Sequence, residues 1–347
     1  MAASPTYDVC VIGAGIVGSS TARYLSCRGK RTLLLEQFLL PHWRGSSHGQ
    51  TRVSHGSYTE QLYTKMFAEA QEVWKEIEEL AKEELLVKNV GMLNVEGGTS
   101  EKLKGIINSL MSSVFLSDKL KDKYPELHFS TDYTAVLEQA AGILKADKCL
   151  RALQAQFVKF GGTLQDNENV VRIHPGTPVC IETNNNVFTA QNVIVTAGPW
   201  TNKLLKPLGL QLPLKFGSAG ETFSKDMCME VDPDLRDAGN DRELVEIHVQ
   251  KARSYLKDHF PQIDHHELAI IEKCIYTTTP DHDFVLDKHP SFPNIVIGAG
   301  FSGHGFKLSP VCGKILAQLA MGEKSSYDLS SFKIARFTNS GKLKASL

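Results

Sequence analysis

Hydrophobic and polar positions along the N-terminal part of the chain predict a compact βαβ unit. Tyr7 to Ile12 is a short apolar run rich in β-branched residues, which is typical of a buried strand. Small apolar and polar residues then continue to Arg28, as in a helix, and residues 31–36 form a second apolar run that ends in an acid. We therefore predict strand, helix and strand in that order.

The pattern farther along the chain predicts more helices and strands. Residues 58–84 repeat apolar side chains at helical spacing, and their charged residues are interpreted as a solvated helix face. The other predicted elements are strands through 170–171, 193–195 and 295–297 and helices over 146–160 and 308–321. Residues 214–245 have little periodicity and much turn chemistry, which indicates a long loop or the remains of something larger.

Size and composition narrow the classes of protein. A chain of 347 residues is expected to form two domains. Its 38 Lys and Arg nearly cancel 39 Asp and Glu, so no net charge favours nucleic acid or an anionic membrane. No apolar run reaches the roughly 18 residues of a membrane span, and the early strand leaves no room for a signal peptide. Seven cysteines without a CxxC pair indicate neither a metal site nor a disulfide framework, hence a reducing interior.

Gly13, Gly15 and Gly18 form a GxGxxG turn between the first predicted strand and helix. Gly13 permits the tight turn, Gly15 lets the backbone approach a pyrophosphate, and Gly18 packs the helix against the strand. The helix N-terminus offers N–H groups and partial positive charge to that pyrophosphate. Glu36 lies 18 positions after the last glycine, where an acid accepts hydrogen bonds from a ribose and disfavours NADP. The stretch predicts dinucleotide binding.

A second glycine-rich turn lies near the C-terminal end. The predicted strand 295–297 leads into Gly298, Gly300, Gly303 and Gly305, and a predicted helix follows. A nicotinamide-dependent dehydrogenase is an alternative, but it would explain only the first turn, and two such turns are unusual in that class of enzyme. They suit a larger ligand such as FAD, with the first turn at the pyrophosphate and the second facing the isoalloxazine ring.

Four motifs, GSSHGQTR, TAGPWTN, CIYTTTPDHDFVLDKHP and GAGFSGHGFK, together resemble the monomeric sarcosine oxidase family. The similarity covers nearly the whole chain except roughly residues 214–245, and it is greatest to the peroxisomal members that act on sarcosine or L-pipecolate. It implies an α/β fold, with a glutathione-reductase-like FAD-binding Rossmann domain and a smaller α+β substrate domain containing an antiparallel sheet. The expected FAD domain comprises residues 1–85, 146–212 and 285–347, and the substrate domain 86–145 and 213–284.

Cys274 has two interpretations. From its residue type alone, Cys274 is interpreted as a buried structural thiol. It matches, however, the flavin-linking cysteine of the family, so the resemblance implies FAD held covalently by a thioether from Cys274 to the 8-methyl carbon. Attachment needs a thiolate, which a cationic neighbourhood favours. The candidates for that neighbourhood are Lys273, Lys288 and His289.

The resemblance also implies roles for side chains around the flavin and the substrate. Arg52 would lie against the flavin and favour its anionic reduced form. Lys307 would bind the substrate carboxylate, the alternative being a helix-start lysine that reaches solvent. Tyr276 and Tyr58 would wall the amine pocket, although Tyr58 is almost equally well explained as a core residue. The cofactor-binding candidates are Gly13, Gly15, Gly18, Glu36, Ser46, His48, Thr51, Arg52, Val170, Gly198, Trp200, Cys274, Gly303, Gly305 and Lys307.

Two departures from the family bear on the substrate. His55 stands where the second arginine of a carboxylate-binding pair is expected, and histidine is shorter, unforked and only partly charged near pH 7. The chain also passes directly from LQLPL to KFGSAG, where family members carry further strands, so the substrate domain is expected to lack strands near 213–216. Lys215 then falls at the expected oxygen-activating lysine, and Ala219 at the family's active-site histidine.

The resemblance implies an FAD-dependent amine oxidase. Hydrogen would pass from a secondary amino acid to FAD, O2 would reoxidise the flavin to give hydrogen peroxide, and the imine would hydrolyse. The alternative is a flavin-binding variant of splice type with impaired catalysis, because lost strands expose sheet edges. No metal, nucleic acid or membrane partner is expected, and the family's members are mostly monomers. The terminal Ala345-Ser346-Leu347 resembles a peroxisomal address read by an import receptor.

Overall fold

The fold is known from a computed structural model. It describes residues 6–88, 90–97, 103–105, 113–115, 122–130, 133–218, 233–234, 242–266 and 275–338. Cys274, Lys273, Ala219 and the terminal tripeptide lie outside the described residues. In the described part, no helix is long and apolar enough to cross a membrane, and no group of His, Cys, Asp or Glu is arranged to hold a metal ion.

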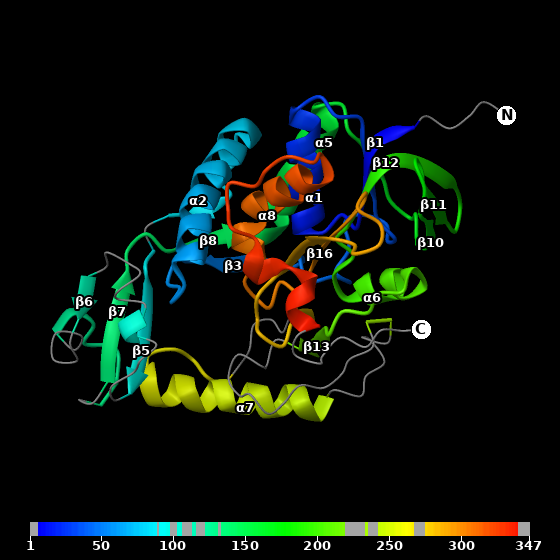
Figure 1. Cartoon of the computed structure of the whole chain (residues 1–347). Coiled ribbons are helices and arrows are strands. Elements are labelled where there is room, and N and C mark those ends of the chain that lie inside the picture. The colour runs from blue at the N-terminus through cyan, green and yellow to red at the C-terminus, as the bar shows by residue number, and fades with distance from the viewer. Residues whose placement is uncertain are drawn as a thin grey trace.

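A largely parallel sheet forms the centre of the molecule (Figure 1). Its parallel strands lie in the order β9 (Thr163–Gln165), β2 (Thr32–Leu35), β1 (Tyr7–Ile12), β12 (Val187–Val195) and β16 (Ile295–Ala299). Three strands add to it in antiparallel pairing: β15 (Val285–Lys288) on β16, β11 (Val179–Thr183) on β12, and β10 (Val170–His174) on β11. β2 and β16 are buried along their whole length, as expected of strands covered on both faces.

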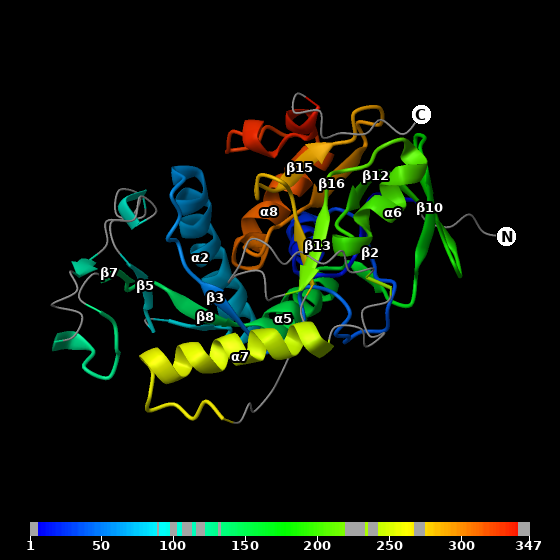
Figure 2. The ribbon, with the colours of Figure 1, turned by 90° about the horizontal axis from the view of Figure 1, so that it is seen from below.

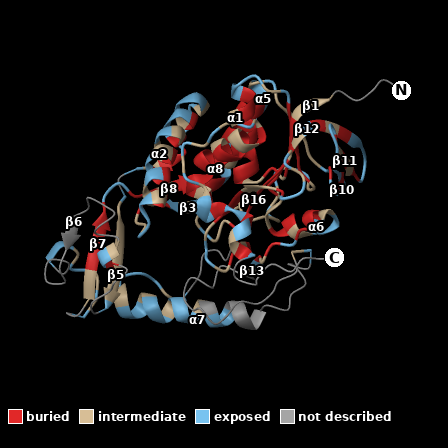
Figure 3. Ribbon diagram, in the orientation of Figure 1, coloured by how far each residue is buried: buried red, intermediate tan, exposed pale blue. Residues whose placement is uncertain are grey.

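Four helices pack against one another beside this sheet. They are α1 (Ile16–Cys27), α2 (Gln61–Ala81), α5 (Ala146–Lys159) and α8 (Gly305–Ala320). α1 packs against α8 and α5, and Figure 3 shows α1 and α8 largely buried. The approach of α8 to α1 depends on Gly313, where a Cβ would lie 2.7 Å from the backbone nitrogen of Thr21. The predicted βαβ unit and helices are confirmed, but α8 begins at Gly305, within the glycine-rich turn.

Smaller antiparallel sheets surround this centre. One comprises β5 (Met92–Gly97), β7 (Tyr133–Glu138) and β6 (Ser113–Phe115), and another comprises β3 (Thr51–Ser54), β8 (Gly142–Lys145) and β4 (Leu86–Val87). β13 (Lys215–Ser218) pairs with β14 (Ile275–Thr278). The short helices are η1 (Gly198–Trp200), α6 (Thr201–Leu205), η2 (Lys206–Leu208), η4 (Ser330–Phe332) and η5 (Ile334–Phe337). The predicted fold class is confirmed, while the domain boundaries stay a prediction.

The predicted loop over residues 214–245 is in part regular structure. β13 forms at its beginning because it pairs with β14, a partner some sixty residues away that periodicity does not reveal. At its end, α7 (Arg242–His259) runs along one side of the molecule toward the β5–β7 sheet (Figures 1 and 2). There the backbone N–H of His128 donates to the carbonyl of His259 at 3.1 Å, which ties α7 to the segment before β7.

Candidate active site

A cavity of about 620 Å³ brings the two glycine-rich turns together. Gly13 and Gly15 line it from the turn between β1 and α1, and Gly300 and Gly303 line it from the turn between β16 and α8. Its size is within the range of small-molecule and cofactor pockets. The prediction that opposite ends of the chain meet at one site is therefore confirmed.

The first turn is a backbone cradle that only glycine fits. Gly13 has φ +100°, and a Cβ there would lie 2.6 Å from the carbonyl oxygen of Thr196. A Cβ at Gly18 would lie 1.9 Å from the carbonyl oxygen of Gly13. The Thr196 hydroxyl donates to the carbonyl oxygen of Ile12 at 3.0 Å, which fixes the turn to the end of β12. These contacts leave the helix N-terminus open to the cavity in the way that a pyrophosphate site requires.

The segment after β2 folds over the first turn of α1. Ser47 Oγ accepts the backbone N–H of Ile16 at 3.0 Å. The Arg52 guanidinium donates to the carbonyls of Ser46 at 3.0 Å and His48 at 2.6 Å. Arg52 lines the cavity and lies 5.5 Å from the centre of the Phe306 ring. It thus links the segment over α1 to the start of α8.

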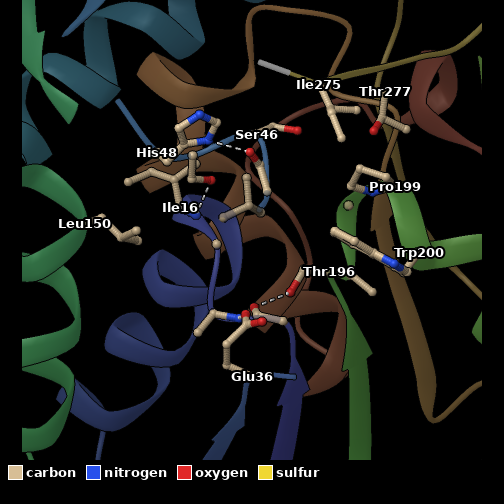
Figure 4. Close-up of a pocket in the computed structure, with 18 of the residues that line it drawn as sticks. Ile16, Glu36, Ser46, His48, Leu150, Thr196, Pro199, Trp200, Ile275 and Thr277 are labelled. Atoms are coloured by element: carbon tan, nitrogen blue, oxygen red, sulfur yellow. Dashed lines mark hydrogen bonds between the residues drawn. The ribbon is translucent and has the colours of Figure 1, made fainter. Parts of the chain in front are cut away.

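Glu36 lies at the end of β2 with 6% of its surface exposed. One carboxylate oxygen accepts the backbone N–H of Ala14 at 2.9 Å, and the other lies 3.4 Å from Nε2 of His42. Figure 4 shows Glu36 at the end of the cavity opposite Ile275 and Thr277. The acid therefore lies beside the glycine-rich turn, where the ribose of a dinucleotide binds in this type of fold.

Most of the predicted cofactor-binding residues line this one cavity. Besides those already named, they are Ser46, His48, Val170, Gly198, Trp200 and Gly305. Tyr276, predicted to wall the amine pocket, lines the cavity as well. Gly18 packs beneath the turn instead. Thr51 and Lys215 are exposed, on β3 opposite Lys145 and on β13 opposite Thr278, and neither lines the cavity. Cys274 is not described, but Ile275 and Tyr276, which follow it, both line the cavity.

A buried cation lies next to this lining. Lys307 follows Gly305 and Phe306 in α8 and is 4% exposed. Its Nζ lies 2.6 Å from Nε2 of His55 and 4.9 Å from the centre of the Tyr58 ring. Burial lowers the pKa of Lys307 to about 7, and the charge of Glu138 opposes that shift. The alternative of a lysine reaching solvent is therefore wrong, and Lys307 lies against His55, the residue that replaces the second arginine of the family's carboxylate-binding pair.

A row of uncharged, hydrogen-bonded groups extends from Tyr58 through His304 to the backbone of His282. His304 Nε2 lies 3.2 Å from the carbonyl oxygen of His282, which can only accept, so Nε2 carries the proton. Nδ1 then accepts the Tyr58 hydroxyl at 3.2 Å. Burial lowers the pKa of His304 to about 4 and raises that of Tyr58, so both are neutral at pH 7. His304 lies inside the GAGFSGHGFK motif, so sequence analysis could have proposed it.

Glu138 is a second residue that sequence analysis missed. It ends β7 and is 2% exposed. Its carboxyl group accepts the backbone N–H of Gly56 at 2.6 Å and also bonds the Ser57 hydroxyl. Glu138 therefore holds the segment that carries His55 and Tyr58. The available signal was an acid at the end of an otherwise apolar strand, YTAVLE.

Comparison with known proteins places the chain in a family. The sequence profile of the FAD dependent oxidoreductase family matches residues 8–224 and 213–319. Human "Peroxisomal sarcosine oxidase" is 38% identical, with 97% of each chain covered. "Monomeric sarcosine oxidase" of an Arthrobacter strain is 30% identical, covering 97% of this chain and 98% of the relative. Among solved structures, NikD, "an unusual amino acid oxidase essential for nikkomycin biosynthesis", has a TM-score of 0.82 at 21% identity, covering 95% of this chain and 98% of NikD.

The structural likeness to NikD supports the fold, and the sequence relatives supply the family. The cavity has two glycine-rich turns in its lining, Glu36 at one end, and Lys307 next to the lining residues Gly305 and Phe306. This arrangement agrees with the fold and with the family. The chain therefore belongs to the FAD dependent oxidoreductases and, among them, to the sarcosine oxidases, a family of FAD-dependent amine oxidases.

Proposed function

We propose that this protein oxidises a secondary amino acid of the sarcosine or L-pipecolate type. The observation that carries the proposal is the buried Lys307–His55 contact beside the cavity of about 620 Å³ that both glycine-rich turns line. Burial disfavours the charge of Lys307 in spite of Glu138, and a substrate carboxylate in direct contact would stabilise that charge. The printed names of the relatives, which include sarcosine oxidases from human and bacteria, support the same substrate class.

The residues of the cavity fit FAD. The Gly13–Gly18 turn and the N-terminus of α1 would hold the pyrophosphate, and Glu36 the ribose. The second turn and Tyr276 would face the ring system. When bound, FAD would accept hydrogen from the α-carbon and nitrogen of the amine and give the electrons to O2, which yields hydrogen peroxide and an imine that water hydrolyses.

Side chains of the chain itself would position the amine. Lys307 and His55 would bind the carboxylate. The ring of Tyr58 would wall the pocket, since its hydroxyl is engaged by His304. Tyr276 would form a second wall, because its ring lies beside Gly303, where a Cβ would be 3.5 Å away. Two aromatic faces around an amine bound by its carboxylate suit a small N-methyl or cyclic amino acid.

Three finer points belong to the same proposal. Cys274 would link FAD covalently, which is supported by its neighbours Ile275 and Tyr276 in the cavity lining. The protein would act as a monomer in the peroxisome, a location suggested by the names of human and mouse relatives. Lys215 stays a candidate for oxygen activation from sequence alone, and its exposure gives it no support.

An impaired flavoprotein is the second candidate, favoured by the length of the chain. The alignment with the human relative spans 383 positions against 347 residues here, so at least 36 aligned positions have no counterpart in this chain. The family match also divides into two segments that overlap at residues 213–224. Both facts support a shortened substrate domain near residues 213–216.

One experiment separates the two candidates. Purified yellow protein is mixed anaerobically with sarcosine, L-pipecolate and L-proline, and the flavin absorbance is followed before air is admitted. Bleaching by an amine, followed by peroxide release in air, is expected of the oxidase. A flavin that stays oxidised with every amine favours the impaired protein.

The covalent link has its own test. Acid precipitation should leave the yellow colour in the pellet, and a Cys274→Ala variant should release it into the supernatant. Colour that leaves the unaltered protein on precipitation would show that the link does not form. Cys180→Ala, a half-buried cysteine on β11, serves as the matched control and should retain its colour.

A further inference from the structure

Lys307 and His55 make a contact that can carry no more than one positive charge. Nζ of Lys307 lies 2.6 Å from Nε2 of His55, a hydrogen-bonding distance. An ammonium only donates, and a protonated imidazole donates at both nitrogens. The contact therefore excludes a charge on both groups: the pair carries at most one positive charge, on Lys307 facing a neutral imidazole or on His55 facing a neutral amine, and without it both groups are neutral.

The surroundings of this pair come from several elements. The pair interacts directly with Tyr58, Glu138 of β7, and His304 just before α8. Glu60, Tyr63 and Cys312 lie around Tyr58, His282 acts on His304, and Asp283 lies against Tyr63. His304 is neutral and bonded to Tyr58, as described above. The carboxyl group of Asp283 accepts the Tyr63 hydroxyl at 2.6 Å. Glu138 is the acid whose charge favours a proton on Lys307.

We infer that a carboxylate binds here only while the Lys307–His55 pair carries its proton, so that binding from alkaline solution takes up one proton. His55 is then the residue that makes amino acid binding depend on pH, since an arginine at this position would keep its charge. This inference rests on the proposed function in one respect, because it takes the pair as the carboxylate site.

Burial and pKa support the inference. Burial lowers the pKa of Lys307 to about 7, so the pair loses its proton within the range where the protein can be handled. A neutral pair offers no charge to a carboxylate, and an unpaired buried carboxylate is costly. Linkage then requires the dissociation constant to rise about tenfold for each pH unit above that pKa.

The test uses 2-furoate, a five-membered-ring carboxylate with no amine to titrate. Its binding to the FAD-loaded protein is followed by the change in flavin absorbance between pH 6 and pH 9. We expect a dissociation constant that is level below about pH 7 and about 100-fold weaker at pH 9. In weakly buffered solution at pH 9, a pH indicator should report uptake of about one proton per ligand bound.

Two variants locate the proton. His55→Arg supplies a charge that does not titrate in this range, so its affinity should fall less than about threefold between pH 7 and pH 9. His282→Asn is the matched control, since it removes a nearby exposed imidazole and keeps the backbone carbonyl that accepts the His304 Nε2–H. Asparagine also tolerates the left-handed backbone at this position, where φ is +63°. It should keep the wild-type slope.

Several outcomes would overturn the inference. They are a wild-type affinity that does not change with pH, uptake well below one proton, a slope in His55→Arg equal to that of wild type, or no binding of 2-furoate at pH 6. The pH dependence and proton uptake of the wild-type protein test the inference even if His55→Arg fails to fold. Because 2-furoate is not oxidised, a protein that binds it as expected but is not reduced by any amine would refute the proposed function and leave this inference standing.

Discussion

At the scale of single residues, the site depends on one buried lysine. Lys307 is 4% exposed and touches His55, while its backbone carbonyl accepts the indole N–H of Trp74 at 3.0 Å. The backbone is thus fixed by α2, and the ammonium is held against an imidazole. A lysine placed in this way costs stability in the folded protein and offers a strong partner to an anion.

Replacing Lys307 by methionine should weaken substrate binding. The loss of a charged hydrogen bond to the carboxylate costs about 1.5–3 kcal/mol, so KM should rise roughly 10- to 150-fold. Steady-state peroxide assays on the best amine substrate measure it. Lys314→Met is the matched control on the same helix, because Lys314 forms a half-buried pair with Glu69, does not line the cavity, and should change KM little. Equal KM values for the two variants would contradict the assignment of Lys307.

The same variant should be more stable than wild type, by an amount that depends on pH. The pKa of Lys307 is 10.5 before burial and about 7 in the folded protein. Between these values the unfolded chain holds a proton that the folded chain lacks, so wild-type stability rises with pH. The advantage of Lys307→Met should therefore be greatest at pH 7 and shrink by up to about 1.4 kcal/mol per pH unit toward pH 10.

Denaturant unfolding of both proteins at pH 7, 8 and 9 tests this expectation. Lys314→Met removes a half-buried ion pair, so its stability should differ from wild type by the same amount at each of these pH values. A stability difference between Lys307→Met and wild type that is constant across this range would show that Lys307 is not the buried titrating group.

At the scale of elements, the turn between β1 and α1 should fail when Gly18 acquires a side chain. A Cβ there would lie 1.9 Å from the carbonyl oxygen of Gly13, so Gly18→Ala should push α1 away from the turn and lower stability by about 1–3 kcal/mol. Retention of FAD should fall with it, because the displaced helix N-terminus is the one proposed to hold the pyrophosphate.

Gly29→Ala separates loss of stability from loss of FAD. Gly29 follows α1 with φ +72° and no atom within 4 Å of a Cβ, so alanine costs only the strain of that conformation, about 1 kcal/mol. The ratio of flavin to protein absorbance after purification should fall for Gly18→Ala and remain unchanged for Gly29→Ala. A normal ratio in both variants would argue against the turn as the cofactor cradle.

Elements defined by local pattern were predictable, and those defined by a distant partner were not. The run from Tyr7 to Ile12 reveals β1 by its own composition. β9 has three residues and no alternation, and it is a strand only because it pairs with β2. The same distinction holds in the site: the motifs contain Arg52 and Lys307, whereas Glu138 reaches Gly56 across 82 positions of sequence.

At the scale of the whole molecule, the two ends of the chain form one binding site. α1 and α8 pack side by side, and each begins at a glycine-rich turn that lines the same cavity (Figure 1). Strands β1, β12 and β16 are neighbours in the sheet, which places their carboxyl ends together. A ligand long enough to reach both turns would therefore stabilise segments that lie nearly 300 residues apart in sequence.

Hydrogen exchange tests whether one ligand spans both turns. Cys274→Ala protein, freed of flavin, is compared alone, with ADP and with FAD. FAD should slow exchange at least about tenfold in residues 13–18 and 300–307 together, because ligand-linked opening is suppressed wherever the ligand makes contact. ADP, which lacks the ring system, should protect only the first turn. The hairpin between β10 and β11, at residues 174–179, lies away from the cavity lining and should exchange equally in all three samples. Protection of the first turn alone by FAD would mean that the C-terminal turn serves another ligand, and the shared-site assignment would then have to be abandoned.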